Sequence, residues 1–191
     1  MIKTDKRSEI MLAALELLAE QGFHGAPMAL IASTAGVAAG TIYNHFASRD
    51  VLIHELLLAI EGRITAEIAD GDAASLPTPR RYSHICTVLL NYFITHPLEF
   101  RYLEQFHNSP YGVEHRRDKI FGEGNEPQPC RDLFKQGVAA REIKDLPLTV
   151  LYALTFGPIL AVTRDHILGF VILDEELRSR IIAACWDAVK R

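Results

Sequence analysis

Residues 31–50, IASTAGVAAGTIYNHFASRD, set narrow limits on how this chain can fold. The first part repeats apolar residues at helical spacing, so that they share one face. Gly36 follows at once, where a sharp turn needs a backbone angle that glycine adopts at little cost. Ile42 and Phe46 are then four residues apart and point the same way from a second helix. The stretch predicts two short helices joined by a tight turn and a third helix start, which is the layout of a helix-turn-helix.

The side of the second helix that faces away from Ile42 is small and polar. Gly40 and Asn44 lie roughly 180° around the helix from Ile42, at about 100° per residue. A glycine inside a helix costs roughly 1 kcal/mol relative to alanine, and here it lets the backbone approach another molecule closely. Groups that can bond phosphate oxygens or base edges are carried by Thr41, Tyr43, Asn44 and His45. We predict that this face lies along DNA.

The residues after this helix support the same interpretation. Ser48 is placed to cap the next helix, and Arg49 would stand near its positive N-terminal end, which suits an anion. A short apolar helix followed by Gly-Val also fits a small helical bundle with a polar surface. The run GTIYNHF favours DNA binding, because glycine, aromatic and polar groups stand together on one short helix.

The N-terminal third of the chain resembles the TetR family of one-component bacterial repressors. The shared features are the first helix EIMLAALELLAEQGFHG, the stretch IAxxAGVAxGTIYxHF and the following SRDVLIHELL. The match covers about residues 7–56, with several motifs in the right order and spacing. The remaining two thirds fit the family only in length and helical character.

The resemblance implies a set of DNA contacts. Phosphate contacts fall on Thr41, Tyr43 and His45, base-edge contacts on Ala38, Ala39 and Asn44, and a further phosphate contact on Arg49, where the family usually has lysine. With Gly40 and the arm residue Lys6, these make up the predicted DNA-binding set. Pro27 departs from the pattern because it replaces a capping Ser or Thr, although proline can still start a helix. Ala39 can touch a thymine methyl but cannot form a bidentate hydrogen bond with a base, so this helix does not predict the sequence of the operator.

Charge predicts that DNA attraction is local. Residues 1–50 hold four Lys and Arg against five Asp and Glu, a net charge of −1. The available cations are in the arm from Lys3 to Arg7 and at Arg49. Because phosphate contacts dominate affinity and its salt dependence, we expect a modest salt slope and weak non-specific binding.

Composition and the positions of helix-ending glycines, prolines and polar loops predict an all-α protein with about nine helices. The chain has 191 residues, of which 49% are hydrophobic, enough for a sizeable core. We divide it into a DNA-binding domain at 1–48, built on three helices, and a larger effector-binding and dimerisation domain at 49–191. The first helix is predicted to stop at Gly22, and later helices are predicted at about 48–69, 80–96, 98–107, from 130, 148–168 and 174–190. Residues 108–112 are interpreted as a turn, and 122–129 as a polar loop.

Cysteine usage and the termini predict a cytoplasmic protein. Cys86, Cys130 and Cys185 are far apart and form neither a metal-type pair nor an even disulfide framework. There is no run of about 20 apolar residues to span a membrane, and the N-terminus lacks the apolar core of a signal peptide.

The last two helices are the most apolar, which fits either a core or an interface. By resemblance to the family, they pair with their copies in a four-helix bundle, and a symmetric dimer also suits a palindromic DNA site. The predicted dimer interface consists of Leu160, Arg164, Ile167, Ile181, Cys185, Trp186 and Val189. Pro158 lies inside the first of these helices and is expected to kink it.

The second domain is rich in aromatic residues, which suit an apolar pocket with a few polar groups. The predicted effector-binding set is Tyr102, Phe106, His107, Tyr152 and Phe156. Aromatic residues at helical spacing also fit an ordinary core. As a group they favour a small apolar or aromatic effector, which by resemblance settles between the helices and shifts the helix after the DNA-binding domain.

Two other classes of protein share single features with this sequence. Glu104 and His107 form an E-x-x-H pair, half of a helical di-iron motif, but the chain has no second copy. No nucleophile motif such as G-x-S-x-G is present either, so we expect no catalytic residue, metal or cofactor. The other alternative is an architectural helix-turn-helix protein that binds DNA without an effector. The effector, the regulated genes and the sign of regulation are not fixed by the sequence.

Overall fold

A computed structural model describes residues 5–70, 75–121 and 128–191. These residues form ten α-helices, as expected for an all-α chain, with an isolated bridge between Ile143 and Lys190. The helices are α1 (Lys6–Gly25), α2 (Met28–Thr34), α3 (Ala39–His45), α4 (Arg49–Ala69), α5 (Thr78–Thr95), α6 (Pro97–His107), α7 (Pro110–Phe121), α8 (Pro129–Ala139), α9 (Leu148–Ile167) and α10 (Glu175–Val189).

The helix absent from the sequence prediction is α7. Residues 108–112 were interpreted as a turn, but the helix begins inside that segment, at Pro110. Proline suits the first turn of a helix because its missing N–H would have no intrahelical partner there. The amide of Gly112 donates to the backbone and side-chain oxygens of Ser109, at 3.0 and 3.4 Å, which closes the first turn. The predicted polar loop at 122–129 lies mostly outside the described residues.

The helices form two compact units. Unit 1 contains the chain up to Gly62 together with Pro97–Val113, and unit 2 contains Arg63–His96 together with Glu114–Arg191. Helices α4 and α7 each begin in unit 1 and end in unit 2. This division by compactness is not the division by function at residue 48, which stays a prediction.

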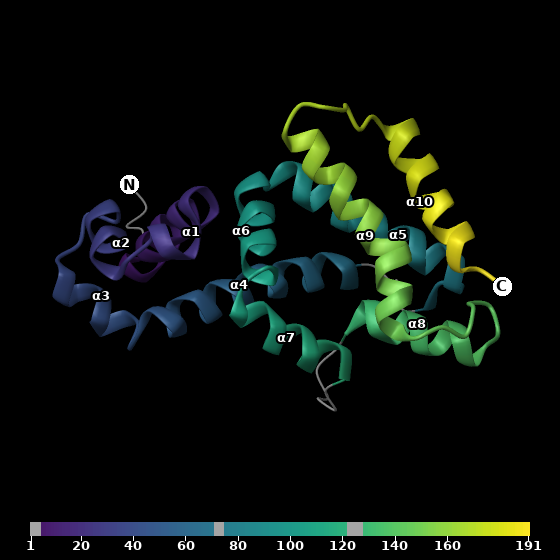
Figure 1. The fold of residues 1–191 in the computed structure, drawn as a ribbon, viewed down its shortest axis with the longest axis horizontal. Helices are drawn as coiled ribbons and strands as arrows, with labels where there is room; N and C mark the ends of the chain where they lie inside the picture. Colours follow the sequence, from purple (N-terminus) through teal and green to yellow (C-terminus); the bar gives the residue numbers. More distant parts are fainter. Residues whose placement is uncertain (1–4, 71–74, 122–127) are drawn as a thin grey trace. The chain divides into compact units, whose positions relative to one another are not determined.

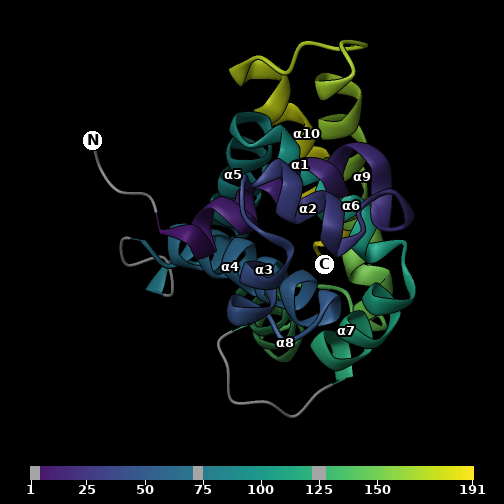
Figure 2. The same ribbon diagram turned by 90° about the vertical axis from the view of Figure 1, so that its left-hand side faces the viewer.

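Unit 1 is built around α1, which packs against α2, α3 and α6 (Figures 1 and 2). Its apolar stripe is fully buried at Ile10, Ala14 and Leu18. The stripe ends where Gly22 takes a positive φ of 69°, and a short turn then continues to Gly25. The sequence predicts that the helix stops at Gly22; the backbone does break there, but α1 ends three residues later, at Gly25.

The turn between α2 and α3 has the predicted glycine geometry. Gly36 adopts a φ of 64°, in the left-handed region that L side chains rarely occupy. The Val37 amide donates to the Ala32 carbonyl at 3.0 Å, and the Gly36 amide to the Ser33 carbonyl at 3.1 Å. This pair of hydrogen bonds is a Schellman motif, which satisfies the last carbonyls of α2 and fixes the direction in which α3 leaves.

Unit 2 is built from α5, α9 and α10, which lie side by side, with α8 against α5 (Figure 1). Pro158 lies inside α9, where it cannot donate the hydrogen bond that continues the helix. None of the helices that the structure describes combines the length and the apolar character needed to cross a lipid bilayer.

Candidate nucleic-acid interface

Helix α3 has one buried side and one side open to solvent. Ile42 and Phe46 are fully buried, whereas 56% of the Tyr43 surface is exposed and Asn44 is exposed as well. The spacing of the apolar residues predicts this orientation, and the structure has it. The polar residues of α3 are therefore available to another molecule.

The remaining predicted residues of this face follow the same pattern. Ala38, Ala39 and Gly40 are exposed, and Thr41 and His45 are half-buried. A Cβ atom added at Gly40 would meet nothing within 4 Å in the chain. Because internal packing does not require glycine at this position, the residue suits close approach by something outside the chain. The structure brings these predicted DNA-binding residues together on one short helix.

Pro27 begins the helix-turn-helix in place of a hydroxyl cap. It has extended backbone angles, and its carbonyl accepts from the amides of Leu30 and Ile31 at 3.0 and 3.1 Å. Helix α2 starts at the next residue, so the prediction that proline can open this helix is confirmed. Without a side-chain cap, this end of α2 lacks the hydroxyl that would reach a phosphate.

Arg49 has partners that sequence reasoning missed. Its Nε donates to the Ala26 carbonyl at 3.0 Å, and a second guanidinium nitrogen donates to the Phe23 carbonyl. The side chain thereby ties the start of α4 to the end of α1. Ser48 caps α4 as predicted, with its hydroxyl accepting from the Val51 amide at 3.2 Å. A phosphate contact by Arg49 stays a prediction and would have to coexist with these bonds or replace them.

Carboxylates hold the cations at the start of α1. Lys6 Nζ lies 2.7 Å from a Glu9 oxygen, and Arg7 pairs with Glu55. The guanidinium carbon of Arg7 also lies 5.2 Å from the centre of the Phe46 ring, within cation–π range. Arg7 was not among the predicted site residues, because nothing in the local sequence pairs it with α3 or α4. These ion pairs lower the positive field that a DNA phosphate would meet.

Three members of the predicted effector set belong to unit 1. Tyr102 and Phe106 are buried beside the ring of Phe23, and the Tyr102 hydroxyl donates to the Ile53 carbonyl at 2.7 Å. His107 is exposed, and its Nδ1 lies 2.7 Å from the Leu103 carbonyl oxygen. Tyr102 and Phe106 thus pack the helix-turn-helix unit from the α6 side, which gives them a structural role there.

The first turn of α7 adds to the same cluster. Tyr111 lies 5.6 Å from Phe23 between ring centres, and its hydroxyl donates to the Asp50 carboxylate at 2.6 Å. This hydrogen bond raises the pKa of Tyr111, because the phenol proton is shared with a carboxylate. Asp50 is in the first turn of α4, so α7 and α4 are tied together close to where α3 ends.

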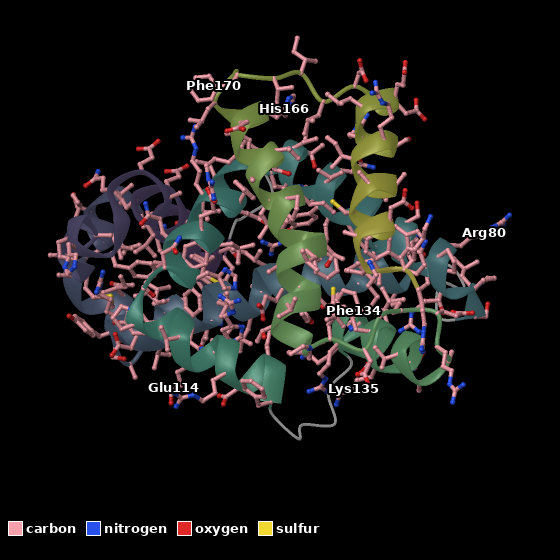
Figure 3. All side chains as sticks on the ribbon, turned by 45° about the vertical axis from the view of Figure 1, so that its right-hand side comes forward. Arg80, Glu114, Phe134, Lys135, His166 and Phe170 are labelled. Carbon is pink, nitrogen blue, oxygen red and sulfur yellow. The ribbon has the colours of Figure 1, made fainter. Side chains whose placement is uncertain are left out.

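The other two predicted effector residues lie in unit 2, in a separate aromatic cluster. Tyr152 and Phe156 on α9 are 5.4 and 5.8 Å from the ring of Phe134, which is labelled on α8 in Figure 3. Tyr82 on α5 joins the cluster at 6.5 Å from Phe156 and 5.2 Å from Trp186. Tyr82 was missed in the sequence because it lies on a mixed stripe of apolar residues and cysteine that reads as ordinary core.

The predicted dimer residues divide into two groups by exposure. Leu160 and Arg164 are exposed, while Ile167, Ile181 and Trp186 are half-buried. Cys185 and Val189 are 6% and 0% exposed and belong to the core of unit 2, and their place at the interface stays a prediction. Helix α9 also exposes Val150 and Leu154, which the sequence prediction did not include. Beyond the end of α9, Phe170, which is labelled in Figure 3, is 78% exposed.

Comparison with known families decides the identity of the chain. Residues 10–56 match the model for bacterial regulatory proteins of the tetR family, and residues 77–190 match the tetracyclin repressor-like C-terminal domain. The second match alone covers more than half of the chain. The chain belongs to the TetR family of transcriptional regulators. It is a DNA-binding helix-turn-helix protein of a non-enzymatic family, which excludes the helical metal enzyme considered above.

Solved structures agree over nearly the full length. A TetR-family transcriptional regulator from Vibrio parahaemolyticus is 33% identical, with a TM-score of 0.77 and coverage of 98% of this chain and 99% of that one. A TetR-family regulator from Haemophilus influenzae has the same fold at 21% identity, with a TM-score of 0.81 and coverage of 99% and 98%.

A curated relative matches only in the N-terminal region. The regulator UidR of Escherichia coli is 36% identical over 64 residues, which is 34% of this chain and 33% of that protein. The chain therefore spans about a third of the length of the first curated relatives that it matches. This similarity concerns the helix-turn-helix region and carries nothing about the effector.

Proposed function

We propose that this TetR-family regulator is a repressor that binds a palindromic operator as a homodimer and releases it when a small apolar or aromatic effector binds. The observation that carries the proposal is α3, which buries Ile42 and Phe46 and leaves Tyr43 and Asn44 exposed. A helix of this kind can enter a major groove with its exposed side. Since an operator lies on the chromosome, the protein acts in the cytoplasm.

An exposed apolar stripe on α9 supports the homodimer. Val150, Leu154 and Leu160 are each 38–39% exposed, and they lie on a helix in the family's C-terminal domain. Together with Arg164, Ile167, Ile181 and Trp186 they form the proposed interface. A two-fold axis through this stripe makes the two copies equivalent, and each copy then reads one half-site about one helical turn from the other.

The path of α4 supports control by an effector. This helix begins at Arg49, directly after α3, and ends within unit 2. An effector bound in unit 2 that displaces α4 would change the separation of the two recognition helices. A coupling free energy of about 1–3 kcal/mol would be enough to weaken operator binding by up to about a hundredfold.

The proposal is tested by selecting an operator from random duplexes and measuring its affinity for variants. Tyr43→Ala removes an exposed side chain of α3 and is expected to weaken operator binding about tenfold, while circular dichroism shows unchanged helix content. Val113→Ala is the matched control, because Val113 is 62% exposed in the same unit but lies on α7. Equal operator affinity for Tyr43→Ala and the parent would contradict the assignment of this face.

The same operator complex tests the alternative of an architectural protein. A repressor of this kind releases its operator when a cognate small molecule is added, and sedimentation shows a dimer with one palindrome. A chain that binds all duplexes alike, and that no small molecule displaces, would be architectural.

A further inference from the structure

The strongest unexplained feature of unit 2 is the hydroxyl group of Tyr82. The side chain is 0% exposed, and its oxygen forms no hydrogen bond with any group that the structure describes. Buried polar groups in folded proteins nearly always have a partner, and a buried donor without one costs about 1–3 kcal/mol. Such a group needs a reason to be retained at the centre of an apolar cluster.

The groups around this hydroxyl do not satisfy it. The Cys86 thiol lies against the phenol and helps to raise the pKa of Tyr82. A thiol is only a weak hydrogen-bonding group, and the pair does not reach the geometry of a full hydrogen bond, so the hydroxyl stays poorly satisfied.

The surroundings of Tyr82 are aromatic and uncharged. Its ring lies 5.2 Å from Trp186 and 6.5 Å from Phe156, measured between ring centres. Burial raises the pKa of the Cys86 thiol to about 12, so this neighbour stays neutral at physiological pH. Burial also raises the pKa of Tyr82, which keeps its phenol protonated and able to donate. An anion placed here would lose its hydration without meeting a cation.

Among the described residues, Arg131 is a buried charged group that acts on the Tyr152 part of the aromatic cluster. Arg131 is 8% exposed and acts on Tyr152, whose pKa it lowers against the stronger effect of burial. Its Nε is 3.8 Å from the Asp132 carboxylate, which offsets part of the positive charge. The Tyr82 end and the Arg131 end of the cluster therefore favour different ligands, and an experiment can separate them.

Helix α9, which forms one wall of the cluster, is easier to bend close to Phe156. Phe156 is two residues before Pro158, where α9 lacks one backbone hydrogen bond. A helix with a missing bond bends there at lower cost than an intact one. This part of the wall can shift to admit a ligand between α5 and α9.

We propose that Tyr82 donates a hydrogen bond to the carbonyl oxygen of an uncharged aromatic or apolar ligand, held among Phe156, Trp186 and the face of α5 that carries Cys86. The inference deepens the proposed function, because it names the chemical class of the effector and the residue that recognises it. The ligand supplies an acceptor that Tyr82 lacks among the residues that the structure describes.

The test uses three small probes of similar shape on the full-length protein. Acetophenone carries a neutral carbonyl, ethylbenzene carries no acceptor, and benzoate carries a negative charge. Trp186 is the single tryptophan of the chain and lies against Tyr82, so its fluorescence reports binding. We expect acetophenone to quench Trp186 saturably, with a dissociation constant about five- to tenfold below that of ethylbenzene, the value of one neutral hydrogen bond.

Two variants assign the preference to the hydroxyl. Tyr82→Phe keeps the ring and should abolish the preference of acetophenone over ethylbenzene. Tyr92→Phe is the matched control in unit 2, because Tyr92 is 2% exposed and its hydroxyl already accepts from Arg63 Nε at 3.1 Å. This control should keep the preference. Thermal unfolding verifies that both variants fold.

The remaining outcomes overturn the inference. The first is an equal affinity of the parent protein for acetophenone and ethylbenzene. The second is tightest binding of benzoate, which would point to Arg131 instead of Tyr82. The third is that no probe quenches Trp186 saturably up to its solubility. The operator complex separates this result from the proposed function. A carbonyl preference that depends on Tyr82 but leaves the operator bound contradicts release by the effector and preserves the recognition by Tyr82.

Discussion

Two fully buried tyrosines, one in each unit, have opposite hydrogen-bonding states. Tyr102 in unit 1 donates to the Ile53 carbonyl at 2.7 Å, whereas Tyr82 in unit 2 has no partner among the residues described. Both are surrounded by other aromatic rings. The difference indicates that the interior of unit 1 is fixed by its own contacts, while the interior of unit 2 keeps a donor that no described residue uses. A regulator needs both properties, because one unit must hold a fixed geometry and the other must respond.

The largest expected effect comes from opening the aromatic cluster of unit 1. Phe106 is 2% exposed and contacts Phe23, Tyr102 and Tyr111. Phe106→Ala should lower the free energy of unfolding by about 3–5 kcal/mol, because it leaves a cavity among rings held by hydrogen bonds. Urea unfolding followed by circular dichroism measures the loss.

Phe121→Ala is the control for that loss, because Phe121 is 72% exposed on α7. Its expected effect is within about 0.5 kcal/mol. Similar losses in the two variants would mean that the cluster of unit 1 is not tightly packed, and the contrast with unit 2 would fail.

A smaller change in the free energy of unfolding is expected when the hydroxyl groups of Tyr102 and Tyr82 are removed and compared. Tyr102→Phe should lower the free energy of unfolding by about 0.5–1.5 kcal/mol, since a satisfied hydrogen bond is lost. Tyr82→Phe should leave it unchanged or raise it, because the deleted hydroxyl had no partner to lose. Both changes remove one oxygen from a fully buried ring, so each variant is the control for the other. A loss at Tyr82→Phe as large as that at Tyr102→Phe would break the comparison.

The smallest effect appears at alkaline pH and is shared by the two tyrosines. Burial raises the pKa of Tyr82 and Tyr102 above the ordinary value of 10. The folded chain therefore holds phenol protons that the unfolded chain releases, so stability is full below about pH 10 and falls as the pH rises further. Melting temperatures between pH 8 and pH 11 should decline less steeply in Tyr82→Phe and in Tyr102→Phe than in the parent. A decline of unchanged slope in both variants would show that neither phenol is held protonated by the fold.

The fold was predictable from the sequence wherever local periodicity and capping decide the structure. The spacing of Ile42 and Phe46 predicts the buried side of α3, and the positions of Gly36 and Ser48 predict a turn and a cap that the structure contains. Helix α7 was missed because its apolar residues do not repeat at a helical period and its proline suggested a turn. The family of the C-terminal domain was also beyond single-sequence reasoning, since it carries no short motif.

The candidate sites were less predictable, because their contacts join residues that are distant in sequence. Arg49 bonds carbonyls 23 and 26 positions earlier, and Tyr102 bonds one 49 positions earlier. Aromatic content predicted an effector set, but it did not separate Phe106, which packs unit 1, from Phe156, which belongs to unit 2. The unsatisfied hydroxyl of Tyr82 depends on everything around it, and no sequence pattern reveals an absent partner.

The contact between α1 and α6 limits how freely this regulator can be recombined with its relatives. A helix-turn-helix domain can be treated as a unit that is exchanged between regulators at a junction in α4. In this chain the domain packs against α6, a helix encoded far downstream, where Tyr102, Leu103 and Phe106 complete its interior. A chimera cut after residue 62 would inherit a foreign α6, so a working graft has to transplant residues 97–113 along with the N-terminal segment. Natural variation in the two segments should be correlated for the same reason.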